Sequence, residues 1–278
     1  MNETISLGVG GDINLIKSKI LSNPDCVFPV SIIKETPEDS ITYFNFEYSE
    51  DIGTLDKYLN VLSEYIIDRY EINIMRRIME ENFNELSQVA KREIIRNVTM
   101  FTDDKEVGYN ARKKSILMSL YECLAEEPKV YLDGFVSFRL RDYEQLIFKL
   151  IEKLAEDYNI KKEYEEFIEL LKYFVEIQSP RPELLNITVE KDGSYRIIDA
   201  DGKDITARCI TEFVGETTVM TETDYDDIII SVLITAAPEK VVVHKGENIK
   251  NRDLFLTIKK VFGKVEYCTG CDLCLSQM

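Results

Sequence analysis

The pattern of apolar and polar residues divides the chain into three parts, and the first of these, residues 1–52, has mixed character. A helical stretch that begins after Asp12 lies between short β-branched and aromatic runs, which have the composition of strands. The turn-rich residues 35–40 predict a hairpin between the last two runs. We therefore expect a small N-terminal α/β unit with strands at 5–9, 27–34 and 41–48.

Residues 53–180 follow a helical pattern instead, with apolar residues three and four positions apart. Pro180 and Pro182 end this pattern, because proline cannot continue a helix. We expect a central helical region with helices at 55–79, 85–101, 111–125, 143–158 and 161–178.

Residues 181–278 return to a mixed pattern, which predicts a C-terminal mixed α/β sheet domain with a cysteine-rich tail. Alternating runs on both sides of Asp192 and Gly193 predict a hairpin. Residues 211–223 are rich in threonine and are expected to form a loop. Further on, the pattern predicts a helix, a strand, a second helix and a last strand, at 224–237, 240–244, 251–262 and 264–267. The three parts together predict an α+β fold.

Composition excludes several classes of function. The chain has 278 residues, with 51 acidic against 34 basic residues and a net charge of -17, so it repels phosphate backbones and a nucleic-acid partner is not expected. Its most apolar run, 228–237, is too short to span a bilayer, so membrane insertion is not expected either. The N-terminus lacks the pattern of a secretory signal, and the six cysteines do not resemble a disulfide framework. We expect a cytoplasmic protein.

Three cysteines near the C-terminus, Cys268, Cys271 and Cys274, form the strongest chemical signal in the chain. Their spacing lets two thiolates converge on one metal ion and places a third close by, so a tetrahedral zinc ion needs one further ligand. The chain's single histidine, His244, ends a predicted strand, and Cys268 follows the end of the next one. If these strands are parallel, both residues lie at the same edge of the sheet. The sequence therefore predicts a Cys3His zinc site, with Cys209 as a reserve ligand.

Other interpretations of the same cysteines stay open. The spacing also begins the iron–sulfur pattern of bacterial ferredoxins, although the fourth cysteine and its following proline are absent. Thiols without a metal, as a redox pair or a loose tail, are a third possibility. His244 taken alone fits an ordinary imidazole at a strand end. Cys26 and Cys123 are most simply buried small apolar residues.

Arg139 and Arg141 are a second candidate site, because two arginines two residues apart on an extended segment point the same way and could bind an anion. In so acidic a chain, ion pairs with acids of neighbouring helices are favoured over this role. Acids that could form such pairs include Glu163, Glu165 and Glu166.

The glycines Gly8, Gly10 and Gly11 suggest a nucleotide-binding loop, but Ile13 occupies the place of a third glycine. A tight turn is therefore favoured. With one histidine and no nucleophile elbow, the sequence offers no catalytic residue.

Five long stretches of the chain are distinctive, at residues 133–143, 163–178, 226–238, 257–262 and 268–274. Together they resemble the YtxC-like family, which is linked to sporulation in endospore-forming bacteria. The resemblance implies a cytoplasmic protein connected with spore formation and implies no particular reaction.

Two function hypotheses follow. The first is a non-enzymatic sporulation factor that binds another protein and carries a structural zinc ion near its C-terminus. The alternative is a redox protein or enzyme that uses the thiols or an iron–sulfur cluster.

Overall fold

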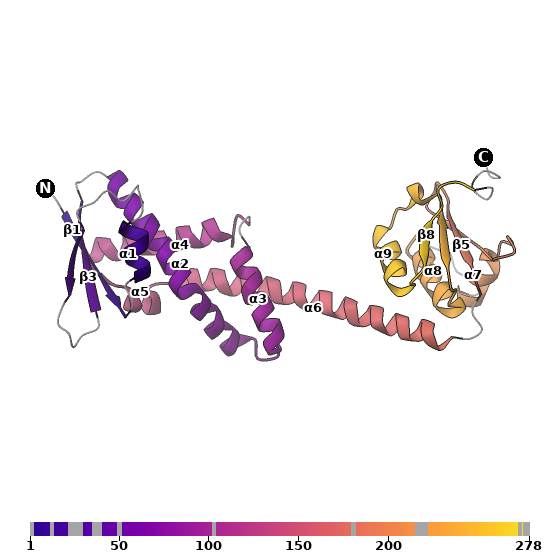
Figure 1. The fold of residues 1–278 in the computed structure, drawn as a ribbon, viewed down its shortest axis with the longest axis horizontal. Helices are drawn as coiled ribbons and strands as arrows, with labels where there is room; N and C mark the ends of the chain where they lie inside the picture. Colours follow the sequence, from indigo (N-terminus) through magenta and orange to yellow (C-terminus); the bar gives the residue numbers. More distant parts are fainter. Residues whose placement is uncertain are drawn as a thin grey trace. The chain divides into compact units, whose positions relative to one another are not determined.

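The computed structural model divides into two compact units, Met1–Asn159 and Ile160–Met278, each with its own sheet and apolar core (Figure 1). The fold is α+β, as the sequence predicts. The three-part division at residues 52 and 180 remains a prediction. The structure describes residues 3–11, 14–21, 30–34, 41–48, 52–101, 104–178, 182–214, 222–271 and 274.

The sheet of the first unit has the strand order β2-β3-β1-β4. The predicted hairpin of β2 and β3 is confirmed, and its connection lies outside the described residues, as does Asp12. β3 also pairs antiparallel with β1, whereas β4 runs parallel to β1 at the other edge. The strands are β1 (Glu3–Gly10), β2 (Val30–Lys34), β3 (Ile41–Tyr48) and β4 (Lys129–Tyr131).

The prediction of a turn at the glycine run is wrong for Gly8 and Gly10, because both lie within β1. A Cβ atom at Gly8 would lie 2.8 Å from the Tyr43 ring, and one at Gly10 would lie 2.8 Å from the Asp133 carboxylate. These two glycines therefore let neighbouring side chains pack against the strand. Of the three glycines in this run, only Gly11, at φ 73°, has the left-handed backbone typical of a turn.

Helices supply most of the first core. The three helices expected between residues 55 and 125 are confirmed, and the Ser87 hydroxyl caps α3 by accepting a hydrogen bond from the Ala90 N–H. The segment of Arg139 and Arg141, expected to be extended, instead lies where helix α5 ends and α6 begins. The helices are α1 (Asn14–Leu21), α2 (Ile52–Asn82), α3 (Gln88–Met100), α4 (Tyr109–Glu126), α5 (Leu132–Phe138) and α6 (Arg141–Ile177).

A buried ion pair lies inside the first unit, between Glu71 on α2 and Arg112 on α4. Their side chains are separated by 3.0 Å, and the Tyr143 hydroxyl also donates a hydrogen bond to the Glu71 carboxylate. Arg112 further donates to the Val107 carbonyl at 3.0 Å. Buried charges are tolerated when they are paired and hydrogen-bonded in this way.

The two helices expected at 143–158 and 161–178 are one continuous helix, α6. That prediction of a break is wrong because Asn159 and Ile160 at the expected boundary are neither glycine nor proline, so nothing there stops the helix. The first half of α6 contributes Ile147 to the core of the first unit, and the second half contributes Ile168 to the core of the second.

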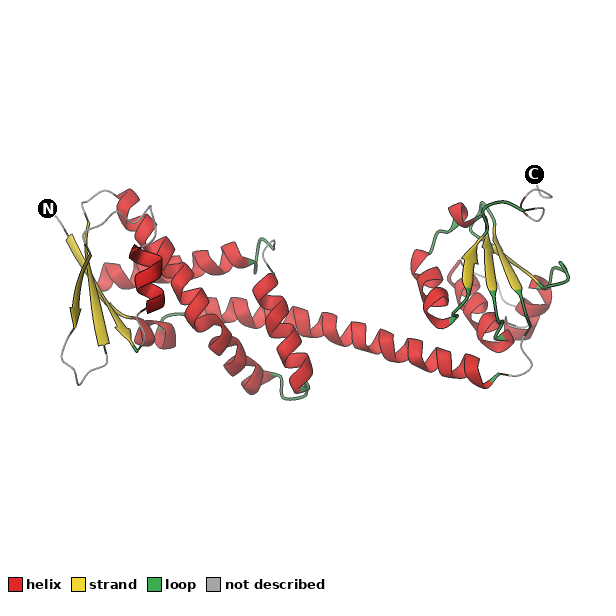
Figure 2. Ribbon diagram, viewed as in Figure 1, coloured by secondary structure: helices red, strands yellow, loops and turns green. Residues whose placement is uncertain are grey.

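The sheet of the second unit, whose strands are drawn in yellow in Figure 2, has the order β6-β5-β7-β8. The predicted hairpin of β5 and β6 is confirmed, while β7 runs parallel to both β5 and β8. The strands are β5 (Leu185–Val189), β6 (Tyr195–Ile198), β7 (Val241–His244) and β8 (Val265–Tyr267). The helices are α7 (Thr206–Val214), α8 (Glu222–Ala236) and α9 (Arg252–Val261).

Helix α7 corrects the expectation of a loop that begins at residue 211. The helix starts after Asp204, whose carboxylate accepts a hydrogen bond from the Thr206 N–H, and it buries Cys209 in the core. The threonines conceal its short apolar face in the sequence. Residues 215–221 of the expected loop lie outside the described residues, and its last two residues, Glu222 and Thr223, begin α8 instead.

Candidate metal centre

The carboxyl ends of β7 and β8 bring His244 and Cys268 to one edge of the second sheet. β7 ends at His244, and Cys268 directly follows the last residue of β8. The two strands are parallel, which meets the condition on which the predicted site depends, and the Cys268 N–H extends their pairing by donating a hydrogen bond to the Val243 carbonyl at 2.8 Å. The strand pairing thus explains why residues distant in sequence meet.

The predicted ligands His244, Cys268, Cys271 and Cys274 form one cluster, with their four donor atoms within 4.8 Å of one another. His244 Nδ1 lies 3.4 Å from the Sγ atoms of both Cys271 and Cys274. Cys274 Sγ lies 3.8 Å from Cys271 Sγ and 3.8 Å from Cys268 Sγ. These separations are well beyond a disulfide bond of about 2.0 Å.

Four of the six separations among these donor atoms have the lengths expected of a tetrahedral metal site. With Zn–S bonds of about 2.3 Å and Zn–N bonds of about 2.0 Å, a regular tetrahedron has S···S edges of about 3.8 Å and S···N edges of about 3.5 Å. The two short sulfur–sulfur distances of 3.8 Å and the two sulfur–nitrogen distances of 3.4 Å are close to these values. The donor set therefore fits a single metal ion.

A tight turn after β8 returns the chain toward Cys268. Gly270 has φ 133°, a backbone conformation that favours glycine, and its N–H points to Cys268 Sγ at 3.3 Å. The Cys274 N–H donates to the Cys271 carbonyl at 3.0 Å. The turn at Gly270 helps to explain how the thiols of Cys268 and Cys271, which are separated by two residues, can face the same point.

The His244 imidazole is held by a second buried polar residue, Asn186 on β5. His244 Nε2 lies 3.0 Å from Asn186 Oδ1, and the Asn186 amide donates its own hydrogen bond to the Asp199 carbonyl at 3.4 Å. Since Oδ1 is an acceptor, Nε2 carries the proton and Nδ1 presents its lone pair to the sulfurs. An imidazole fixed by a partner on its far nitrogen is typical of metal sites.

Burial influences the protonation of both kinds of donor. His244 is only 3% exposed, and burial lowers its pKa, which favours the neutral imidazole that binds metals. Burial also raises the pKa of Cys274, with further contributions from hydrogen bonds to Cys271 and Cys268. A metal ion that binds these thiols therefore displaces protons from them.

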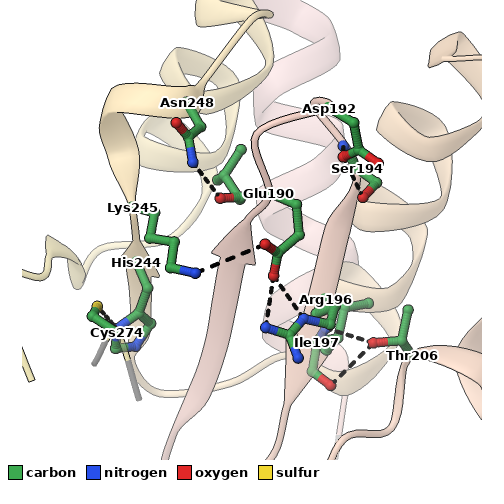
Figure 3. Close-up of polar contacts among 11 residues, drawn as sticks. Glu190, Asp192, Ser194, Arg196, Ile197, Thr206, His244, Lys245, Asn248 and Cys274 are labelled. Atoms are coloured by element: carbon green, nitrogen blue, oxygen red, sulfur yellow. Dashed lines mark hydrogen bonds and ion pairs between the residues drawn. The ribbon is translucent and has the colours of Figure 1, made fainter. Parts of the chain in front are cut away.

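A cleft of about 790 Å³ opens beside the cluster, and Cys268 and Cys274 contribute to its wall. Within the cleft, the Glu190 carboxylate accepts from the Arg196 guanidinium at 2.6 Å and lies 3.8 Å from Lys245 Nζ (Figure 3). The cleft gives a metal ion a path to the thiols from solvent.

Arg139 and Arg141 do not lie on an extended segment, because Arg139 follows helix α5 and Arg141 begins α6. Arg139 is paired with Glu126 of α4 at 2.8 Å, an exposed contact. The expected pairing with an acid of a neighbouring helix is therefore present for Arg139, with a partner other than Glu163, Glu165 or Glu166. Anion binding by these arginines stays a prediction.

The remaining cysteines lie outside the cluster or outside the described residues. Cys209 is buried in the apolar core of the second unit, so His244 rather than this reserve ligand completes the cluster. Cys123 packs against the first core but is only partly buried, so the prediction of a buried apolar residue holds in part. Cys26 lies outside the described residues. Asn186 was not predicted, and its signal in the sequence is weak, because it is one of two polar residues, with Thr188, that alternate with apolar residues in β5.

Among the helices of the described residues, none contains a stretch that is both long and apolar enough to cross a bilayer.

Fold and site define an α+β protein with a Cys3His cluster at the edge of its second sheet. The YtxC-like family model matches residues 56–266, and the chain belongs to this family. The resemblance found in the sequence is thereby confirmed. The match includes His244 and ends before Cys268.

One relative is the uncharacterized protein YtxC of Bacillus subtilis (strain 168). It is 24% identical to the chain over 209 residues, which cover 73% of this chain and 72% of the relative. No solved structure matches the chain.

Proposed function

We propose that His244, Cys268, Cys271 and Cys274 bind one zinc ion, and that this ion stabilises the C-terminal unit of a non-enzymatic, protein-binding factor. The observation that carries the proposal is the arrangement of the four donor atoms, whose distances of 3.4 and 3.8 Å suit the edges of a zinc tetrahedron. The orientation of His244 by Asn186 supports it further.

The ion is proposed as structural because the protein supplies all four ligands. A catalytic zinc keeps one position open for water or substrate, whereas four protein donors fill a tetrahedral site. The chain's one histidine is itself a member of the cluster, so no second imidazole is present for acid–base chemistry. Metal binding instead links the end of β7 to the residues that follow the edge strand β8.

An iron–sulfur cluster is the alternative, and the donor geometry favours zinc over it. In a four-iron cluster each cysteine binds a different iron, which separates the sulfurs more widely than ligands of one ion. The sulfur distances of 3.8 Å suit a single ion, and one of the four donors is a nitrogen. The fourth cysteine of the ferredoxin pattern is also missing.

The cellular role that we propose is participation in spore formation in the cytoplasm, through binding to another protein. The link to sporulation is what the resemblance to the YtxC-like family implies, and the match to the family model supports that resemblance. The net charge of -17 supports a protein rather than a nucleic acid as partner. Deletion of the gene in a spore-forming host should lower the yield of heat-resistant spores while leaving vegetative growth unchanged. An unchanged spore yield would argue against the role.

Metal analysis of the full chain, purified without oxygen, tests the site. We expect about one zinc per chain in the wild type, a colourless solution, and loss of the metal in Cys271→Ser. Cys123→Ser is the matched control and should retain zinc, because Cys123 packs against the other core. A brown protein that absorbs near about 400 nm would favour the iron–sulfur alternative. A wild-type chain that binds neither metal would refute the proposed site.

A further inference from the structure

The second half of α6 has two apolar faces. One face, which includes Ile168 and Leu171, is buried in the core of the second unit. The other face is exposed, and we call it the α6 stripe. Its apolar members and their exposed fractions are Ile160 (59%), Phe167 (46%), Leu170 (51%), Tyr173 (57%), Phe174 (41%) and Ile177 (56%).

The α6 stripe has the spacing of a helix–helix interface. Its residues fall into columns with a seven-residue repeat, the spacing at which two helices pack along their lengths. The central column is Glu163, Leu170 and Ile177, with Ile160, Phe167 and Phe174 on one side and Glu166 and Tyr173 on the other.

The exposed area is also sufficient for a specific contact. Six large side chains that are about half exposed present on the order of 600 Å² per chain, so a symmetric pair would bury about 1,200 Å² in total. This value lies at the lower end of stable protein interfaces. An apolar patch of this size on one helix face marks an interaction surface.

We propose that the α6 stripe joins two copies of this chain, with their α6 helices antiparallel about a two-fold axis at Leu170. The stripe is complementary to itself in this arrangement. Leu170 contacts Leu170 of the second copy, and Phe167 packs on Phe174 of the second copy, because these positions lie three residues before and four after the axis.

The polar residues of the stripe support the same arrangement. Glu166 lies opposite Tyr173 of the second copy, whose hydroxyl can donate to the carboxylate. Lys162, on the border of the stripe, lies opposite Glu176 of the second copy, which brings unlike charges together. Lys162 is also 3.5 Å from Glu166 in its own helix, but an exposed pair of this kind contributes little.

Two other occupants of the stripe are less favourable. A parallel pair would place each residue opposite its own copy, so that Glu163, Glu166 and Lys162 would each meet a like charge. A membrane surface rich in anionic lipids would be repelled by Glu163, Glu166 and Glu169, which lie in or beside the stripe. The charge pattern therefore selects the antiparallel second copy.

The test is the oligomeric state of the full chain from about 1 to about 100 µM, by light scattering and sedimentation. We expect a mass of twice the chain's 32.2 kDa at the upper concentrations. Leu170→Glu should weaken dimerisation at least about tenfold, since it places two carboxylates at the axis. Met118→Glu is the control, because Met118 is 54% exposed on α4 of the other unit and should leave the dimer intact.

A charge exchange tests the antiparallel arrangement and does not depend on the folding of Leu170→Glu. Lys162→Glu and Glu176→Lys should each weaken the dimer about threefold, and the double variant should restore it. The two positions are fourteen residues apart on one helix, so only contact between copies can couple them. Absence of rescue would refute the antiparallel arrangement.

Several results would overturn the proposal as a whole. These are a wild-type chain that is monomeric throughout the concentration range, and a dimer that survives Leu170→Glu. Flotation of a monomeric wild-type chain with phosphatidylglycerol vesicles, lost in Leu170→Glu, would assign the stripe to a membrane surface instead. The proposal does not rest on the zinc site, so metal analysis and oligomeric state can fail independently.

Discussion

At the scale of single residues, Asn186 determines which nitrogen of His244 faces the thiols. The side-chain oxygen of Asn186, Oδ1, lies 3.0 Å from Nε2 and accepts its hydrogen bond, so Nδ1 is the nitrogen that faces the cluster. Asn186 would not touch the metal and would act only by positioning the imidazole.

Asn186→Ala is therefore expected to lower zinc affinity by about 10- to 100-fold while the four ligands stay in place. Competition with a chromophoric chelator measures the affinity. Asn60→Ala is the control, because Asn60 makes its hydrogen bond to the Asp56 carbonyl within α2 of the first unit. Equal zinc affinity in Asn186→Ala and the wild type would show that Asn186 does not position His244.

In the first unit, the Asp104 carboxylate makes a contribution to stability that depends on pH. It accepts hydrogen bonds from the backbone N–H groups of Glu106 and Val107. These bonds, and then the contact with Lys153, lower the pKa of Asp104 below its usual value of 3.8. The pKa of Asp104 is therefore lower in the folded chain than in the unfolded chain. Ionised Asp104 stabilises the fold fully at pH values above the unfolded-state pKa, and this stabilisation is lost as the pH falls through the folded-state pKa.

Asp104→Asn is thus expected to reduce the resistance of the first unit to urea at neutral pH, and the difference from the wild type should shrink as the pH falls below about 4. Urea titrations at several pH values measure this. A difference that stays constant with pH would mean that the charge of Asp104 is not responsible.

At the scale of elements, helix caps offer matched tests in the two units. Ser87 caps α3 through the Ala90 N–H at 3.2 Å, and Asn251 caps α9 through the Leu254 N–H at 3.1 Å. Replacing either by alanine should lower stability by about 1 kcal/mol, as measured by urea unfolding. Hydrogen exchange should place the effect of Ser87→Ala in the first unit and that of Asn251→Ala in the second. A uniform increase in exchange would contradict separate cores.

Elements with a clear period were predictable from the sequence, and those determined by context were not. Apolar residues recur at helical spacing along α2 and alternate with polar residues in β5 and β6, so each of these patterns indicates one kind of element. Helix α7 was missed because it is short, holds two threonines and runs into the threonine-rich stretch that follows it. The unbroken α6 was missed because polar residues near Asn159 resemble a boundary, although none of them stops a helix.

The candidate site was predictable to the extent that chain order determines it. His244 and Cys268 could be placed together because consecutive parallel strands end at the same edge. Asn186 could not, because its pairing with His244 depends on β5 lying beside β7, a strand order that the local pattern does not reveal. Long-range neighbours of this kind follow from the topology of the sheet alone.

At the scale of the whole molecule, the proposed zinc ion should stabilise one unit selectively. A chelator is expected to raise hydrogen exchange in β7 and β8, since β7 ends at His244 and β8 directly precedes Cys268, and to leave β1 and β3 of the first unit largely unchanged. Mass spectrometry of exchanged peptides measures both regions at once. Equal loosening of the two units, or of neither, would contradict a stabilising ion in the second.

Helix α6 has a kinetic consequence, because its two halves belong to different cores. Starting a helix is unfavourable by about 4 kcal/mol, whereas lengthening an existing one is nearly neutral. The core that folds first therefore contains a formed half of α6, and the helix can extend from the end of that half into the other core. The second core to fold adds its half of α6 turn by turn from Asn159 onward or backward, without a nucleation step of its own.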